Sequence, residues 1–123
     1  MPNNEYLSER VEELMAEVTQ LKYRVRLLAG LVDLEREPFT VLNLSHELTE
    51  RQASSILDLM DETRQAIEKG EDINHHKFEQ KVYDIVPTEN GNYHFAENIV
   101  SALNEESRYD DVYEYMKKDG MNI

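Results

Sequence analysis

The side chains in this sequence that could bind a metal ion begin with its four histidines. His75 and His76 form an adjacent pair, and His75 with Glu79 has the i, i+4 spacing that places two ligands on one face of a helix. Consecutive residues on a helix point about 100° apart, so the two histidines are not expected to face one ion, and no third ligand is evident beside His75 and Glu79. The sequence therefore predicts no metal site. We interpret the pair as the solvated start of a helix, and the isolated His46 and His94 as surface or capping groups.

Acidic residues at helical spacing raise a second candidate chemistry, Mg²⁺-dependent hydrolysis of nucleotides. All-α pyrophosphohydrolases of the MazG type hold Mg²⁺ with Glu and Asp side chains on two facing helices. This chain offers two sets of carboxylates: Glu9, Glu12, Glu13 and Glu17, and then Asp58, Asp61 and Glu62. Their spacing does not reproduce the paired ExxE and ExxD pattern of that class. A solvated acidic face is favoured, and the hydrolase is kept as the alternative function.

Nucleophilic and cofactor chemistry find no support in the composition. The chain has no cysteine, which excludes disulfides, thiol nucleophiles and thiolate zinc sites. Its serines, such as Ser54, Ser55 and Ser101, lie inside helical patterns, and no GxSxG elbow is present. With four glycines in all, the chain lacks a glycine-rich phosphate loop. No catalytic residue and no cofactor are therefore expected.

The charge balance argues against direct binding of nucleic acid. The sequence has 26 acidic and 13 basic side chains, a formal net charge of −13 and a pI of about 4.6. Phosphate backbones are bound by clustered Lys and Arg. Residues 48–52 weakly resemble the start of a helix-turn-helix motif, but its recognition helix would carry Asp58, Asp61 and Glu62, which would repel phosphate. The acidic surface suits a basic protein partner instead. A sharper form of this hypothesis is a DNA mimic that inhibits a nucleic-acid-binding protein.

The hydropathy of the chain predicts a cytoplasmic protein without a membrane segment. Residues 1–6 have neither the basic nor the apolar region of a signal peptide. The longest apolar stretch, residues 27–32, is far shorter than the roughly 20 residues of a membrane span.

An uninterrupted heptad pattern occupies the first part of the sequence. Apolar residues alternate spacings of four and three, with Val at every a position and Leu at every d position: Leu7, Val11, Leu14, Val18, Leu21, Val25, Leu28 and Val32. β-Branched residues at a with Leu at d favour a two-stranded parallel coiled coil. In this register Glu17 at a g position meets Lys22 at the following e position of a partner helix. We therefore expect a homodimer whose interface comprises the heptad residues from Leu7 to Leu28 together with Glu17 and Lys22.

An amphipathic helix packed on its own domain is the alternative explanation of this pattern. From Leu27 the apolar stripe widens to include Leu31 and Leu34, which is broader than a two-stranded seam requires. We therefore expect the helix to pass from a dimer seam over about residues 7–32 into the core of a globular part.

Helical periodicity continues through the rest of the chain and predicts an all-α fold. Pro38 suits the first position of a helix, and Thr49 with Gln52 forms a capping box that opens the next helix. Gly70 and the pair Asn90–Gly91 indicate loops between helices. We expect a coiled-coil dimerisation helix within residues 1–37, followed by a compact bundle of four or five short helices within residues 38–123.

The C-terminal segment combines tyrosines with acidic residues. Tyr109 and Tyr113 lie four residues apart and are expected in the core. Tyr115 is expected on the surface, where tyrosine contributes apolar area with a polar tip to protein interfaces. The candidate partner surface is formed by Tyr115, Asp110, Asp111 and Glu114.

Several short motifs from about residue 31 onward are shared with a known family. They are the residues VDLEREPF at 32–39, LTE at 48–50, Asp61–Glu62, Ala102–Leu103, Glu105, and the run 109–116. Through them the chain resembles a small uncharacterised Bacillus family typified by the protein YhaI. The resemblance implies an all-helical, oligomeric fold and brings no activity and no catalytic residues. The long heptad and the Asn90–Gly91 loop depart from that family's pattern, which leaves the oligomeric geometry open.

Taken together, these features predict a non-enzymatic, homodimeric protein-binding or regulatory module. Small acidic proteins of this kind also occur in phages that infect such bacteria, so the expected origin is bacterial or phage. The expected partners are a second copy of the chain and a basic protein, with no nucleic acid and no membrane.

Overall fold

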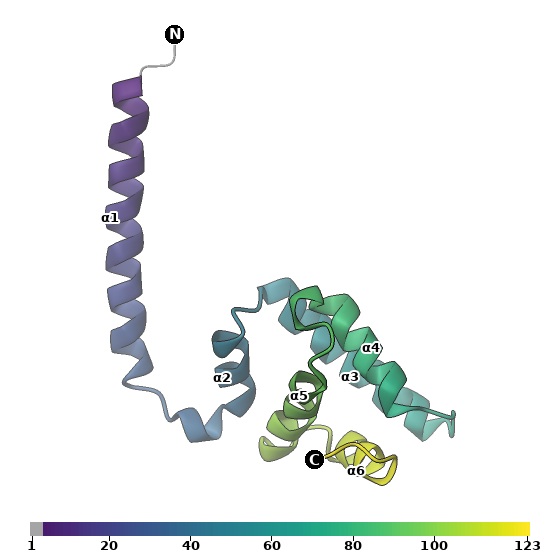
Figure 1. The fold of residues 1–123 in the computed structure, drawn as a ribbon. Helices are drawn as coiled ribbons and strands as arrows, with labels where there is room; N and C mark the ends of the chain where they lie inside the picture. The colour runs from purple at the N-terminus through teal and green to yellow at the C-terminus, as the bar shows by residue number, and fades with distance from the viewer. Residues whose placement is uncertain (1–3) are drawn as a thin grey trace. The chain divides into compact units, whose positions relative to one another are not determined.

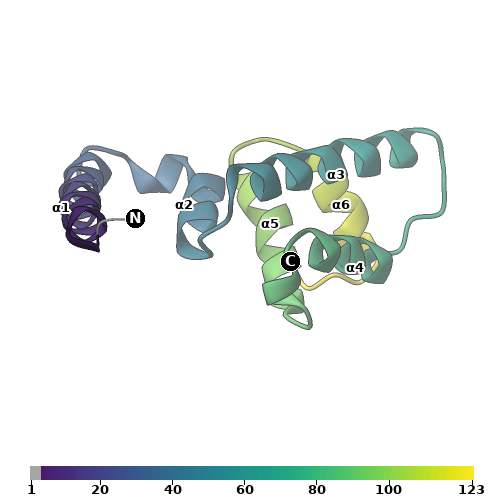
Figure 2. The same ribbon diagram turned by 90° about the horizontal axis from the view of Figure 1, so that it is seen from above.

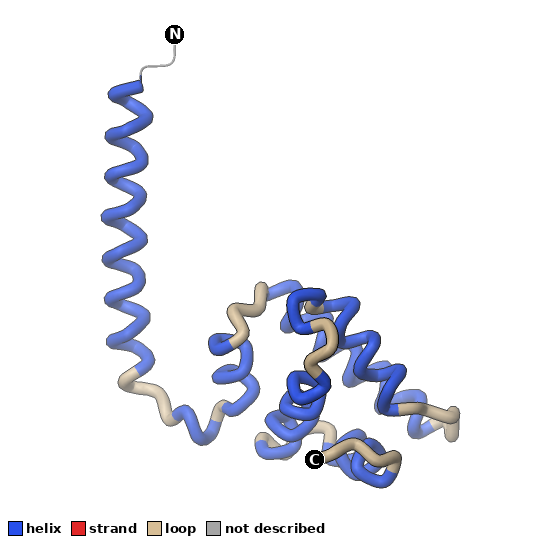
Figure 3. The backbone as a smooth tube through the Cα atoms, in the orientation of Figure 1, coloured by secondary structure: helices blue, strands red, loops and turns tan. Residues whose placement is uncertain are grey.

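The computed structural model describes residues 4–123, in which helices are the only regular structure (Figures 1 and 3). The α-helices are α1 (Asn4–Ala29), α2 (Pro38–Ser45), α3 (Glu50–Glu68), α4 (His75–Ile85), α5 (Tyr93–Glu105) and α6 (Asp110–Lys118). Two short 3-10 helices, η1 (Leu34–Arg36) and η2 (Pro87–Glu89), precede α2 and α5. The prediction of an all-α chain, with a long N-terminal helix ahead of a helical bundle, is confirmed. Within residues 4–123, no helix combines the length and the apolar character that crossing a membrane requires.

The chain divides into two compact units, residues 1–33 and residues 34–123. We expected the boundary after residue 37. The observed boundary lies earlier because η1 packs against α2 and so belongs to the second unit. Residues 1–3 of the expected first segment, which also begin the stretch considered for a signal peptide, lie outside the described residues.

The first unit consists of α1, which buries none of its residues. Leu27, Leu31 and Leu34, which were expected to enter a core, are 55%, 84% and 50% exposed. The helix also ends at Ala29 and not near Val32. Gly30 follows directly, and glycine weakens a helix because its backbone has the most conformational freedom to lose. The N–H of Leu31 bonds to the carbonyl of Leu28 in a tightened last turn.

The second unit is a bundle built on α5, which contacts α2, α4 and α6 (Figure 2). Helix α3 lies beside α4 and also contacts α6. The α5 residues that are buried include Phe95, Ile99, Val100 and Leu103. The other helices add Phe39 and Leu42 from α2, Ile56 and Met60 from α3, Phe78 and Val82 from α4, and Val112 and Met116 from α6. Each pair is separated by three or four residues, so the apolar periodicity of 3.6 places one face of every helix in a shared core.

Local signals in the sequence determine where the helices of the bundle begin. The hydroxyl of Thr49 accepts from the N–H of Gln52 at 3.1 Å, and the Gln52 side chain accepts from the N–H of Thr49 at 3.0 Å. The predicted capping box is therefore confirmed. Pro38 is the first residue of α2, and the next N–H, that of Phe39, donates to Oε2 of Glu106 at 2.8 Å. This bond ties the start of α2 to the end of α5.

Replacing Thr49 by Ala is expected to lower the free energy of unfolding of the bundle by about 1 kcal/mol. The N–H of Gln52 would lose its acceptor at the start of α3. Urea unfolding followed by circular dichroism measures the change. The matched control is Thr88→Ala, at an exposed position in η2, which should stay within about 0.5 kcal/mol of the wild type. Equal losses in the two variants would contradict the prediction.

Candidate functional site

Helix α1 presents a continuous apolar seam. Its heptad residues from Leu7 to Leu28 are between 47% and 61% exposed, although large aliphatic side chains are among those most often buried in folded proteins. Shallow apolar grooves follow the same side of the helix. One is lined by Val11, Leu14, Met15, Val18, Thr19 and Lys22, and the next by Val18, Leu21, Lys22, Val25 and Arg26. Exposed apolar surface of this extent is typical of an interaction site.

Acidic side chains on α6 form the second candidate surface. Asp110 and Glu114 are exposed and lie one helical turn apart, and Asp111 is exposed between them. Asp111 accepts from Nε of Arg64 on α3, with both carboxylate oxygens 3.2 Å from that nitrogen. One of the three carboxylates is thus paired within the chain.

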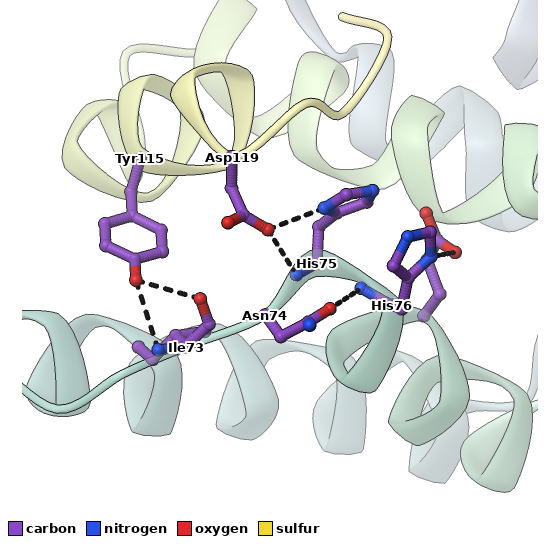
Figure 4. Close-up of polar contacts among 7 residues, drawn as sticks. Ile73, Asn74, His75, His76, Tyr115 and Asp119 are labelled. Carbon is purple, nitrogen blue, oxygen red and sulfur yellow. Dashed lines mark hydrogen bonds and ion pairs between the residues drawn. The ribbon is translucent and has the colours of Figure 1, made fainter.

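Tyr115 is not a free surface group, which corrects the expectation from sequence. Its hydroxyl donates to the carbonyl of Ile73 at 2.9 Å and accepts from the N–H of the same residue at 3.1 Å (Figure 4). The ring packs against the core, as do the buried Tyr109 and the half-buried Tyr113 that were expected there. The candidate partner surface is therefore reduced to its three carboxylates.

Tyr109 joins α6 to α3 through its polar end. Its hydroxyl donates to Oδ1 of Asp61 at 2.6 Å, and the guanidinium carbon of Arg64 lies 4.3 Å from the centre of its ring. Burial, followed by the hydrogen bond to Asp61 and the charge of that carboxylate, raises the pKa of Tyr109 to about 12. Sequence reasoning placed this ring in the core but did not find its partners.

The carboxylates considered for a nucleotide hydrolase have other surroundings in the structure. Asp61 accepts from Tyr109, and Glu62 lines a cleft between α3 and α4 of about 180 Å³. This is smaller than the roughly 300–1,000 Å³ of most small-molecule pockets. The other set, residues 9–17, lies on α1 in the first unit. Among the described residues, neither set by itself brings three ligands close enough to share an ion.

Two histidines and a glutamate do come together at the start of α4. His75, His76 and Glu79 each offer a ligand atom, and these atoms all lie within 4.8 Å of one another. The two imidazole rings lie side by side, with centroids 4.0 Å apart (Figure 4). The expectation that consecutive histidines diverge is therefore wrong. The angle of about 100° separates their backbone directions, and rotation about the side-chain bonds brings the rings together.

Asp119, just after α6, holds the first of these histidines. Its Oδ2 lies 2.6 Å from Nδ1 of His75 and accepts from the backbone N–H of His75 at 2.8 Å. These two hydrogen bonds lower the pKa of the Asp119 carboxyl below its ordinary value. The two residues are far apart in the sequence, and no local pattern connects them.

Comparison with known proteins adds no relative to this description. No protein-family model matches the chain, and no curated protein or solved structure matches it significantly. Functional inference therefore depends on the residues of this chain and their geometry.

Stability at alkaline pH should depend on Tyr109. Its pKa is raised from 10.0 to about 12, so the folded state holds the phenol proton more tightly than the unfolded chain does. The resulting stabilisation is complete below pH 10 and is lost as the pH rises towards 12, by about 2 to 3 kcal/mol at most. Urea unfolding between pH 8 and 12 measures this loss.

Two variants isolate the contribution of this phenol. Tyr109→Phe should be less stable than the wild type near neutral pH and lose less stability above pH 10. Tyr93→Phe, which changes an exposed tyrosine, should follow the wild-type pH dependence. The same slope in all three proteins would refute this assignment.

Proposed function

We propose that this protein is a non-enzymatic, homodimeric module that binds a basic protein partner in the cytoplasm of a bacterium, or of one infected by phage. The observation that carries the proposal is the exposed apolar seam of α1. A lone helix cannot bury a stripe of Val and Leu, and seven layers in strict heptad register match a second copy of the same helix.

The charges beside the seam favour a parallel dimer. In parallel register Glu17 faces the partner subunit's Lys22, and the same pair forms again on the other side. Antiparallel pairing of the same layers would place Arg10 opposite the partner subunit's Arg24, and Glu17 opposite the partner subunit's Glu17. These like-charge pairs disfavour the antiparallel orientation. Arg10 is also neutralised within its own helix, because it donates to Glu13 at 2.8 Å.

The charge of the dimer supports docking on a basic partner. Two copies of a chain with a net charge of −13 carry −26, and such a charge speeds encounters with a positively charged surface. Asp110 and Glu114 are placed to make local contacts, because they lie exposed on α6, which the core contacts of Val112 and Met116 hold in place.

Placing a charge in the seam should dissociate the dimer. Val18→Asp or Leu21→Asp would put a carboxylate into a dry layer, where burial of an unpaired charge is strongly unfavourable. Light scattering coupled to gel filtration should give a mass near 14.5 kDa for these variants and near twice that value for the wild type. The control is Ala16→Asp, which adds the same charge at an f position on the opposite side of α1 and should remain dimeric. Dimers that survive both seam substitutions would exclude the proposed interface.

Binding of the partner should depend on the carboxylates of α6 beyond their effect on net charge. Asp110→Asn with Glu114→Gln should reduce capture of a stoichiometric bacterial protein at low salt, and high salt should reduce capture by the wild type. The matched control is Glu9→Gln with Glu12→Gln, which removes the same charge from the outer side of α1. Quantitative mass spectrometry compares the captured proteins. Equal retention by the two double variants would remove α6 from the proposed interface.

A further inference from the structure

We propose that His75, His76 and Glu79 bind a divalent transition-metal ion, with Zn²⁺ as the fitting species. Two imidazoles with one carboxylate form a ligand set typical of zinc sites that keep a fourth position for water. Imidazole nitrogen selects zinc and its neighbours in the periodic table over Mg²⁺ and Ca²⁺, which prefer oxygen ligands. The site lies in the helical bundle and is independent of the proposed dimer.

The spacing of the ligand atoms suits one ion. Bonds of about 2.0 Å at tetrahedral angles place two ligands of zinc about 3.3 Å apart. Nδ1 of His76 lies 3.7 Å from Oε2 of Glu79, which is too long for a hydrogen bond and close to this value. The whole set falls within 4.8 Å, so small side-chain rotations close the site around an ion.

His75 is oriented for this role by a residue that follows α6. Asp119 occupies Nδ1 of the ring at 2.6 Å, which leaves Nε2 available as the ligand. A carboxylate behind a coordinating imidazole is the usual arrangement in zinc sites, because it fixes the ring and makes the nitrogen more basic. Asp119 is therefore a positioning residue of the proposed site.

The electrostatic surroundings favour a cation. The N-terminus of a helix carries partial positive charge, which by itself opposes cation binding. Here that charge is offset by oxygen acceptors, because Asn74 accepts from the N–H of His76 at 2.7 Å and Asp119 accepts from the N–H of His75. An ion can enter freely, because the His76 side chain is 74% exposed.

Titration of the untagged protein with Zn²⁺ tests the proposal. Calorimetry should show one ion per chain, and excess Mg²⁺ should not compete. Bound Co²⁺ should give the visible absorption of a tetrahedral nitrogen–oxygen site. Added Zn²⁺ should displace Co²⁺ and remove this absorption. Zn²⁺ should also raise the melting temperature, because the folded state alone presents the assembled ligands.

Variants locate the ion within the chain. His76→Ala and Glu79→Gln should each weaken Zn²⁺ binding at least about tenfold, and Asp119→Asn should weaken it about tenfold through the orientation of His75. The control is His94→Ala, which removes an exposed histidine that has its own glutamate, Glu97, at i+3 but no second histidine. This variant should bind Zn²⁺ as the wild type does.

The His76→Ala variant tests the site without disrupting the helix that carries it. His76 is exposed, and its backbone N–H, which α4 needs for its cap, survives the change to Ala, so this variant should fold. Equal Zn²⁺ affinity in His76→Ala and His94→Ala would overturn the proposal, as would binding that Mg²⁺ abolishes. Loss of binding in His76→Ala and Glu79→Gln, with retention in His94→Ala, would establish it.

Discussion

Burial of α5 is the constraint on which the bundle depends. This helix contacts α2, α4 and α6, and its residues Phe95, Ile99 and Leu103 have no exposed surface. Each neighbouring helix is too short to be stable alone in water, so its stability comes from apolar contacts with this shared element. Polar contacts then fix the arrangement. The carboxylate of Glu106 accepts from the N–H of Phe39 near the start of α2. Oε1 of Glu89, which precedes α5, lies 2.7 Å from Nδ1 of His46. The pKa of Glu89 is lowered by its hydrogen bonds to Asn92 and His46.

The two units show two ways of dealing with apolar surface. In the bundle, short helices turn their apolar faces towards one another within a single chain. Helix α1 is longer than any of them, and none of its residues is buried. In the proposed dimer, a second helix of matching periodicity would remove its Val and Leu side chains from water. The same amphipathic pattern therefore marks the core of a single chain in the bundle and an exposed apolar surface in α1.

Features encoded over a few residues were predictable from the sequence, and features made by distant residues were not. The capping box of α3 and the loop between helices at Asn90–Gly91 are determined by residues that are neighbours in the sequence. The roles of His75 and Tyr115 depend on contacts with residues that are distant in the sequence, and the end of α1 was also not predicted. Tyr115 meets Ile73, and His75 meets Asp119, across more than forty residues. The geometric argument against paired histidines failed because it followed backbone directions and ignored the rotation of side chains that a distant carboxylate holds in place.

The connection between α5 and α6 has a consequence for the stability of this turn. Ser107 and Tyr109 both adopt left-handed backbone conformations, with φ of 59°, which cost non-glycine residues of order 1 kcal/mol each. The loop before α5 uses Gly91 at a φ of 85° and avoids this cost. Local preference and tertiary packing therefore conflict at the α5–α6 turn, a case of local frustration. The contacts of Tyr109 with Asp61 and Arg64 on α3 have to offset this cost, so the turn is stable only together with α3.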